Sequence, residues 1–192
     1  MNPVVRSEIL DLGAYEQVRE AFRRRVIELK RLRRVELGSN ITALFENRDT
    51  VLYQVQEMLR TERITREDAI SHELETYNEL IPARDELSVT FFIEYPDKDE
   101  RDRMLVALAG VEDKFYLEVS GDRVPVRNET RGTMSDRTTA VQYAKFLLPA
   151  TLAAGLRSRE KPAVALGVEH PAYSARAVLP PRTVEEIEHD LD

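Results

Sequence analysis

The spacing of apolar residues changes near residue 83, and this change constrains the fold more than any other feature of the sequence. Before that point, apolar residues recur every three or four positions, which is the period of amphipathic helices. After it, they mostly alternate with polar residues, as in half-buried strands. The pattern predicts an α+β fold in which N-terminal helices pack on a mostly antiparallel sheet.

The first part, residues 1–83, is expected to be mainly helical with one hairpin. A long helix is predicted over 14–34, a hairpin turn at 38–40, and a second helix capped by Asn47. The apolar stripe of the long helix consists of Tyr15, Val18, Phe22, Val26 and Leu29. One such stripe indicates that a single face of this helix is buried.

The second part, residues 84–192, is expected to be rich in strands. The order strand, helix, strand, strand occurs over 87–126 and again over 140–179. We therefore predict two β-α-β-β units, which form one six-stranded sheet or two packed three-stranded halves. A chain of 192 residues with 42% hydrophobic content suits one compact core, so residues 1–192 are interpreted as a single domain.

The composition excludes several classes of chemistry. The chain has no cysteine, which removes disulfides, thiolate catalysis and iron–sulfur ligation by its own side chains. No apolar run is long enough for a membrane span, and no secretion segment is present at the start, so a cytoplasmic protein without a membrane partner is expected. The net charge of −7 makes nucleic acid an unlikely partner.

One segment is strongly basic, although the chain as a whole is acidic. Residues 19–34 contain eight arginines and lysines against two glutamates. A helix of this kind could bind RNA, an acidic partner, or the chain's own acidic helices over 57–79. The last alternative is favoured.

The most concentrated polar group lies at the predicted start of the second helix, at Glu46, Asn47, Arg48 and Asp49. A helix N-terminus offers unpaired N–H groups to an anion, and an arginine can add a bidentate contact. Capping by Asn47 explains the same residue types without a ligand, and it is the favoured interpretation. A binding site would combine this loop with the distant residues Arg137, His170 and Tyr173.

No cofactor or metal site is predicted. The chain has no glycine-rich phosphate loop and no Gly-x-Ser-x-Gly elbow. Glu186 and His189 match one half of a di-iron helix motif, but the second pair is missing and the C-terminal tail is expected to fray. The polar stretch 127–137 is long for a simple connection, and it could form a lid in which Arg131 and Arg137 face an anion.

Four segments resemble a bacterial family that is described only as a domain of unknown function. They are LFENRDTVLYQVQEMLR at 44–60, ETYNELIP at 75–82, DRTTAVQY at 136–143 and HPAY at 170–173. The resemblance spans nearly the whole chain and supplies no catalytic residues. It implies genes beside those for rubrerythrin and a cysteine-rich iron–sulfur oxidoreductase subunit, and hence a role alongside redox or peroxide-defence enzymes.

Two functional hypotheses follow. The first is a non-catalytic accessory or interaction protein whose partner is a rubrerythrin or an iron–sulfur oxidoreductase. The second is a cofactor-free enzyme or a small-anion-binding protein that uses the loop 46–49, and the sequence leaves open whether the chain is an enzyme. A homodimer is compatible with both, because strand alternation leaves a sheet edge available.

Overall fold

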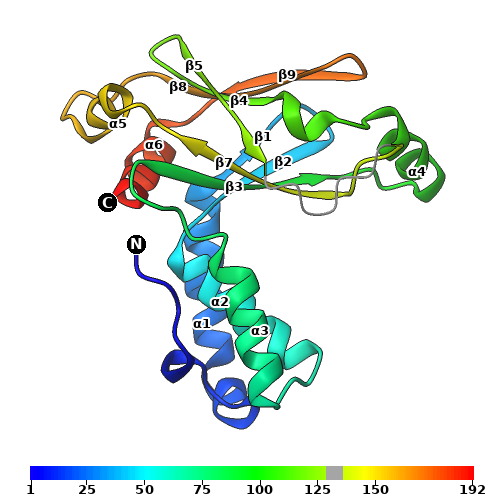
Figure 1. The fold of residues 1–192 in the computed structure, drawn as a ribbon, viewed down its shortest axis with the longest axis vertical. Helices are drawn as coiled ribbons and strands as arrows, with labels where there is room; N and C mark the ends of the chain where they lie inside the picture. Colours follow the sequence, from blue (N-terminus) through cyan, green and yellow to red (C-terminus); the bar gives the residue numbers. More distant parts are fainter. Residues whose placement is uncertain (129–135) are drawn as a thin grey trace.

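The computed structural model describes residues 1–128 and 136–192. It consists of a broad region of two packed sheets from which a bundle of three helices projects as an arm (Figure 1). The predicted α+β class is confirmed. The interpretation of the stretch 127–137 as a lid falls largely outside the described residues.

The arm is formed by three helices with a small core of their own. They are α1 (Leu12–Arg33), α2 (Arg48–Thr61) and α3 (Glu67–Asn78). Asp11 caps α1 and Asn47 caps α2, each through a side-chain oxygen that accepts from a backbone N–H in the first turn. The core of the arm contains Val4, Ile9, Val51, Val55, Leu59, Ile70, Leu74 and Ile81.

Two side-chain amides hold the N-terminal segment against this bundle. The side chain of Asn78 bonds both backbone groups of Val4, at 2.8 and 2.9 Å. Gln56 does the same for Leu10, at 3.0 Å in each direction. A short turn, η1 (Arg6–Glu8), lies between these two contacts. The first ten residues therefore belong to the folded arm.

The strands form two antiparallel sheets. The first has the order β1-β2-β3-β7-β6, and its strands are β1 (Arg34–Glu36), β2 (Ile41–Glu46), β3 (Glu86–Ile93), β7 (Val141–Leu147) and β6 (Arg127–Asn128). The second has the order β5-β4-β8-β9, with β5 (Asp122–Pro125), β4 (Phe115–Val119), β8 (Val164–His170) and β9 (Tyr173–Val178). Every strand pair is antiparallel, as predicted.

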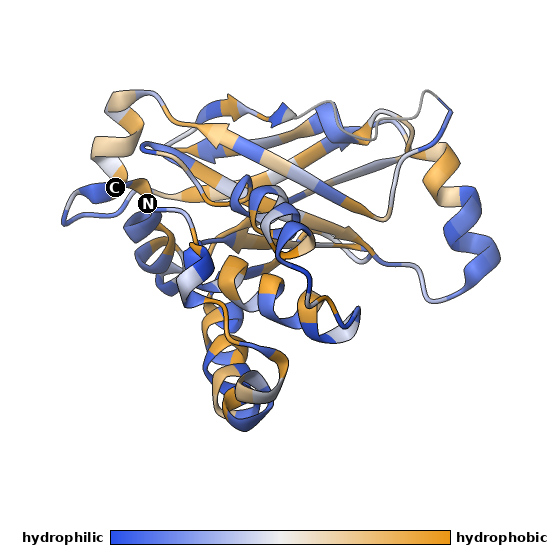
Figure 2. Cartoon of the chain, turned by 60° about the horizontal axis from the view of Figure 1, so that its bottom comes forward, coloured by the Kyte–Doolittle hydropathy of each residue, from blue (hydrophilic) through white to orange (hydrophobic). Residues whose placement is uncertain are grey.

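The main core fills the space between the inner faces of the two sheets. Alternate residues of β3 and β4 point inward, and Phe91 stacks on Phe115 with ring centroids 3.7 Å apart and planes 11° apart. Both rings are buried, so this pair directly joins the two sheets. Figure 2 shows that hydrophobic residues run along the strands and alternate with hydrophilic ones along the helices of the arm.

Shorter helices close the two ends of the sheet pair. At one end, α4 (Lys98–Ala107) and the turn η2 (Val111–Lys114) follow β3. At the other end, α5 (Ala150–Arg157) packs beside α6 (Pro181–Glu188) and the turn η3 (His189–Leu191) (Figure 1). Buried residues from these elements extend the main core, among them Leu105, Leu108, Leu156, Ile187 and Leu191.

The helices and strands of the two predicted units occur in the expected order along the chain. Their strands, however, form neither one six-stranded sheet nor two three-stranded halves. The first strands of the units, β3 and β7, pair with each other in the five-stranded sheet. The remaining four strands, β4, β5, β8 and β9, form the other sheet. Neither unit is a separate half, because the apolar faces of β3 and β7 are covered by strands of the opposite sheet.

The predicted packing of N-terminal helices on the sheet is confirmed by the contacts between α1 and β2. One further expectation is corrected. The C-terminal tail does not fray. Its residues Val184, Ile187 and Leu191 are buried in the main core.

Candidate functional site

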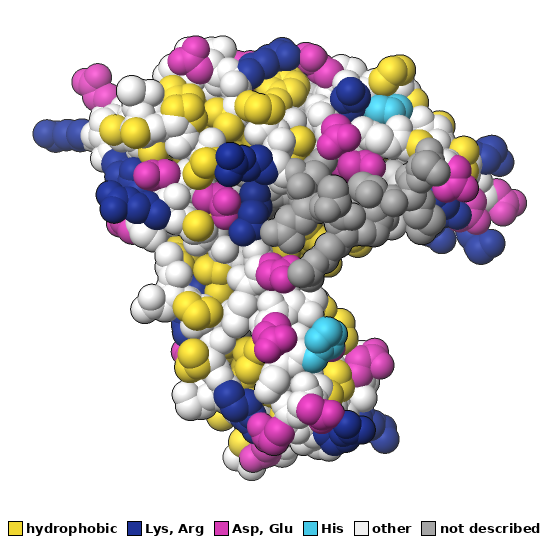
Figure 3. Space-filling view, in the orientation of Figure 1, with side chains coloured by type: hydrophobic (Ala, Val, Ile, Leu, Met, Phe, Trp, Pro, Cys, Tyr) yellow, Lys and Arg dark blue, Asp and Glu magenta, His cyan; other side chains and the backbone are white. Residues whose placement is uncertain are grey.

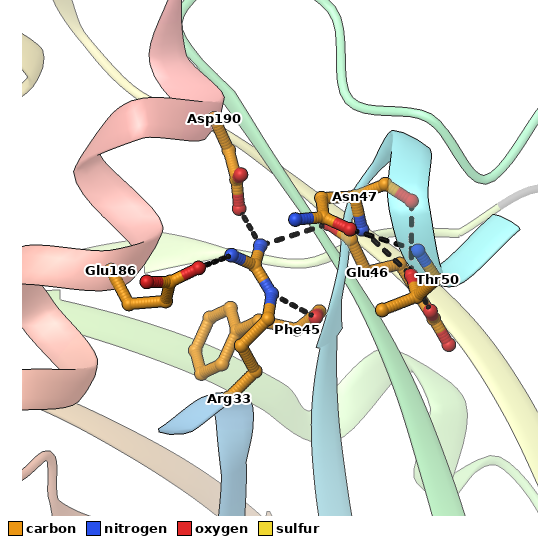
Figure 4. A network of polar contacts seen from close by, with 7 residues as sticks. All are labelled: Arg33, Phe45, Glu46, Asn47, Thr50, Glu186 and Asp190. Carbon is orange, nitrogen blue, oxygen red and sulfur yellow. Dashed lines mark hydrogen bonds and ion pairs between the residues drawn. The ribbon is translucent and has the colours of Figure 1, made fainter. Parts of the chain in front are cut away.

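A buried arginine lies where the arm meets the sheets. Arg33, the last residue of α1, has a side chain with no exposed surface. Its Nε donates to the carbonyl of Phe45 at 2.9 Å, and its Nη1 donates to Glu186 at 3.0 Å. Its Nη2 contacts the carboxylate of Asp190 and the carbonyl of Glu46 (Figure 4). One planar guanidinium thus joins α1, the end of β2 and the C-terminal helix.

This network places two carboxylates beside one fixed positive charge. Asp190 is 1% exposed, and its Oδ1 has no hydrogen-bond partner among the described residues. Burial raises the pKa of Asp190 to about 7, although the charge of Arg33 acts in the opposite direction. Glu186, also beside Arg33, adds to the rise. A proton on Asp190 therefore relieves the excess negative charge of the cluster.

We expect Asp190 to make stability depend on pH. Because the pKa of Asp190 is higher in the folded chain than in the unfolded chain, the folded state binds more protons between about pH 4 and pH 7. Its contribution to the free energy of unfolding should fall as the pH rises through that window, and stay constant above it. The variant D190N, which cannot titrate, should lose this slope in urea unfolding measured from pH 4 to pH 8. The exposed neighbour Asp192 supplies the control, D192N. Parallel curves for the wild type and D190N would contradict the assignment.

Glu46 and Asn47 fix the start of α2 to the sheet. The carboxylate of Glu46 is buried and accepts hydrogen bonds from Thr90 at 2.6 Å and from Thr50 at 2.5 Å. Asn47 accepts from the backbone N–H of Thr50 at 3.0 Å, while the Thr50 hydroxyl accepts from the N–H of Asn47 at 2.9 Å. The predicted cap at Asn47 is confirmed.

Arg48 and Asp49 are also engaged within the chain. Arg48 donates to the carbonyl of Asn2 at 3.0 Å and forms an ion pair with Glu8. Asp49 lies 3.7 Å from the guanidinium of Arg25 on α1. Both contacts hold neighbouring parts of the arm together, which agrees with the capping interpretation of this loop.

The other residues of the predicted site lie elsewhere. Arg137 pairs with Asp102 of α4 at 4.0 Å. His170, at the end of β8, lies with its Nε2 3.1 Å from the carbonyl of Ala109, and its Nδ1 accepts from the N–H of Ala172 at 3.1 Å. None of these contacts involves the start of α2.

Tyr173 holds the β1–β2 turn. Its hydroxyl donates to the carbonyl of Leu37 at 2.7 Å and accepts from the N–H of Asn40 at 3.1 Å. Gly38 has a φ of +75°, and a Cβ there would come within 2.4 Å of the Tyr173 hydroxyl. Since Glu46 is at the opposite end of β2, the structure does not bring Tyr173 and Glu46 together.

The basic helix is partly neutralised by its neighbour. Arg19 makes two bonds to Glu57 of α2, at 2.7 and 2.8 Å, and Arg25 faces Asp49. Arg31 pairs with Glu28 of the same helix. On the face that Figure 3 shows, basic and acidic side chains are interspersed. These contacts support the favoured interpretation, in which the helix packs on acidic residues of the chain itself.

A different surface lies on the outer face of the five-stranded sheet. Val141, Tyr143 and Leu147 of β7 are 37%, 50% and 39% exposed, and we call these three residues the β7 patch. It adjoins a depression of about 460 Å³, whose mainly apolar lining includes Phe92 and Tyr95. This surface was not predicted, because alternation along a strand does not show whether its outer face is covered.

Two kinds of feature are absent from the described part of the chain. In residues 1–128 and 136–192, no group of three or more His, Asp or Glu side chains is placed to hold a metal ion. No helix in the described part of the chain is long and apolar enough to cross a membrane.

Comparison with known proteins places the chain in a family. The model of the family "Protein of unknown function (DUF3501)" matches residues 3–191. The crystal structure of a protein of unknown function from Burkholderia pseudomallei K96243 is similar over 100% of both chains, with 32% identity and a TM-score of 0.92. No curated protein matches the chain. The chain therefore belongs to the DUF3501 family, as its four characteristic segments indicated.

Proposed function

We propose that this chain is a non-catalytic interaction protein that works alongside redox or peroxide-defence enzymes, with the β7 patch as its partner-binding surface. The observation that carries the proposal is the exposure of Val141, Tyr143 and Leu147 on one face of one strand. Large apolar side chains grouped on a protein surface mark interaction sites more often than singly scattered ones do.

The chemistry of this surface suits binding more than catalysis. The three side chains share a face because strand residues two and four positions apart point the same way. Lys145 lies among them, and its ammonium pairs with Glu86 at 2.9 Å, so it adds no unpaired charge to the patch. A partner that covers the patch would bury apolar area without stripping water from a free ion.

The partner class comes from the family resemblance. A rubrerythrin or an iron–sulfur oxidoreductase subunit would supply the metal and thiol chemistry that a cysteine-free chain cannot supply itself. We place this complex in the cytoplasm, because a cysteine-free chain fits a reducing compartment.

Affinity capture from the native host at natural expression tests the proposal. The wild-type chain should recover a rubrerythrin or an iron–sulfur oxidoreductase, and the variant V141S/Y143S should lose it. The matched control is V178S, since Val178 is 61% exposed but lies on β9 of the other sheet. Recovery of neither partner, or equal recovery by V141S/Y143S, would refute the proposal. Sedimentation of the purified chain separates self-association through the same patch from binding of a second protein.

The alternative, a cofactor-free enzyme or anion-binding protein at the loop 46–49, has less support. The guanidinium of Arg48 is turned toward the N-terminal segment, and the carboxylate of Glu46 next to the helix start would repel an anion. Titration with inorganic phosphate, compared between the wild type and R48M, tests this alternative directly.

A further inference from the structure

We propose that the depression beside Arg101 binds a carboxylate carried on an apolar group. The ligand would place its apolar part against the sheet and its carboxylate against the guanidinium. The inference concerns the isolated chain, and it does not depend on a protein partner for the β7 patch.

The shape and lining of the depression fit a small ligand. Its volume of about 460 Å³ lies within the range of small-molecule sites, roughly 300–1,000 Å³. Its apolar lining includes Phe92 at the end of β3, Val141 at the start of β7, and Tyr95 and Pro96 ahead of α4. An apolar ligand group would therefore replace water over an aromatic floor.

Arg101 is the charged group that gives the depression its selectivity. It lies in α4, and its Nη1 donates one long hydrogen bond, 3.4 Å, to the carbonyl of Tyr95. Among the described residues it has no carboxylate partner, although the neighbouring Asp102 pairs with Lys98 and Arg137. A half-buried guanidinium can bind a carboxylate in a bidentate arrangement.

The other charged groups nearby leave room for an anion. Glu94 also lines the depression, but its Oε2 accepts from the hydroxyl of Thr42 at 2.6 Å, which holds this carboxylate toward β2. The guanidinium carbon of Arg34 lies 6.0 Å from the centre of the Phe92 ring, so a second cation lies near the lining of the depression and can attract the negative end of a ligand.

Two sources could supply this ligand chemistry: a free organic acid, or the C-terminal carboxylate of a peptide with an apolar last residue. Both would use the same guanidinium and the same aromatic floor. Two matched pairs of probes separate them. One pair is naphthalene-2-carboxylate and its neutral amide. The other is a short peptide ending in Leu-Phe, with a free C-terminus or an amidated one.

Calorimetric titration of the full chain with these four probes tests the site. At least one acid should bind, and its amide should bind about tenfold or more weakly, because a charge-assisted hydrogen bond is lost. The variant R101M should bind the acid only as weakly as the wild type binds the amide. The control R103M removes an exposed arginine of the same helix that has no ion pair among the described residues, and it should leave binding unchanged.

Each outcome decides the inference. Tighter binding of the peptide acid identifies a peptide C-terminus as the source, and tighter binding of naphthalene-2-carboxylate identifies a free acid. Failure of both acids to bind, or equal binding of acid and amide, overturns the proposal without any variant. If R101M is unstable, R101K replaces it, and the acid should then bind more weakly than to the wild type, because the planar fork is lost. None of these results depends on affinity capture, so the inference can fail while the proposed function stands.

Discussion

Replacing Arg33 by methionine is expected to lower the free energy of unfolding by about 3–5 kcal/mol, the cost of breaking a buried ion pair by removing one partner. The substitution would remove the hydrogen-bond partner of the buried Asp190 carboxyl and the donor to the carbonyl of Phe45. It would also release the contact between α1 and the C-terminal helix. Urea unfolding at pH 7 measures the effect.

Two variants make this prediction specific. R31M removes an arginine whose side chain is 72% exposed, and it should change stability by less than about 1 kcal/mol. The double variant R33M/D190N should lose less free energy of unfolding than the sum of the losses in R33M and D190N, since the two side chains contact each other. If R33M were as stable as R31M, the network would not hold the arm to the sheets.

Replacing Phe91 by alanine is expected to cost about 3–5 kcal/mol, the usual range for a large buried aromatic ring. Phe91 has no exposed surface, and its ring lies 3.7 Å from that of Phe115. The substitution would open a cavity between the two sheets that neighbouring strands can close only partly. Thermal and urea unfolding should both report the loss.

The matched control is V106A, because Val106 is 55% exposed at the far end of α4. Its effect should stay within about 0.5 kcal/mol. F91A/F115A should be less destabilising than the sum of the single variants, because each single variant already removes the ring contact. If the losses of the two single variants added up to that of the double variant, the two rings would not be energetically coupled.

The local elements could be predicted from the sequence because their causes are local. The Gly-Ser-Asn turn predicted the hairpin of β1 and β2, and Asn47 predicted the start of α2. The C-terminal helix begins at Pro181, because proline suits a first helical position. The partition of strands between sheets was not predictable, since it depends on pairings between distant strands.

The buried network around Arg33 was not predicted, for a related reason. Arg33 and Asp190 are 157 residues apart in sequence. A pattern still pointed to each of them: Arg33 continues the buried line of Val26 seven residues later, and Val184, Ile187 and Leu191 recur at helical spacing. An arginine on an apolar stripe requires a buried partner. Within the predicted site, Glu46 and Asn47 both bond Thr50, because they share one helix start.

The division of each β-α-β-β unit between two sheets has a consequence for folding kinetics. The β3–β7 and β4–β8 pairings both join strands about fifty positions apart, and neither sheet can be completed by residues of one unit. Pairings of this kind give a high contact order, which slows folding because chain entropy is lost before the contacts form. A ribosome-bound chain would have to wait for β8 before the core between the sheets could close. We therefore expect slow refolding in a single main phase, and no stable fragment that ends before β8.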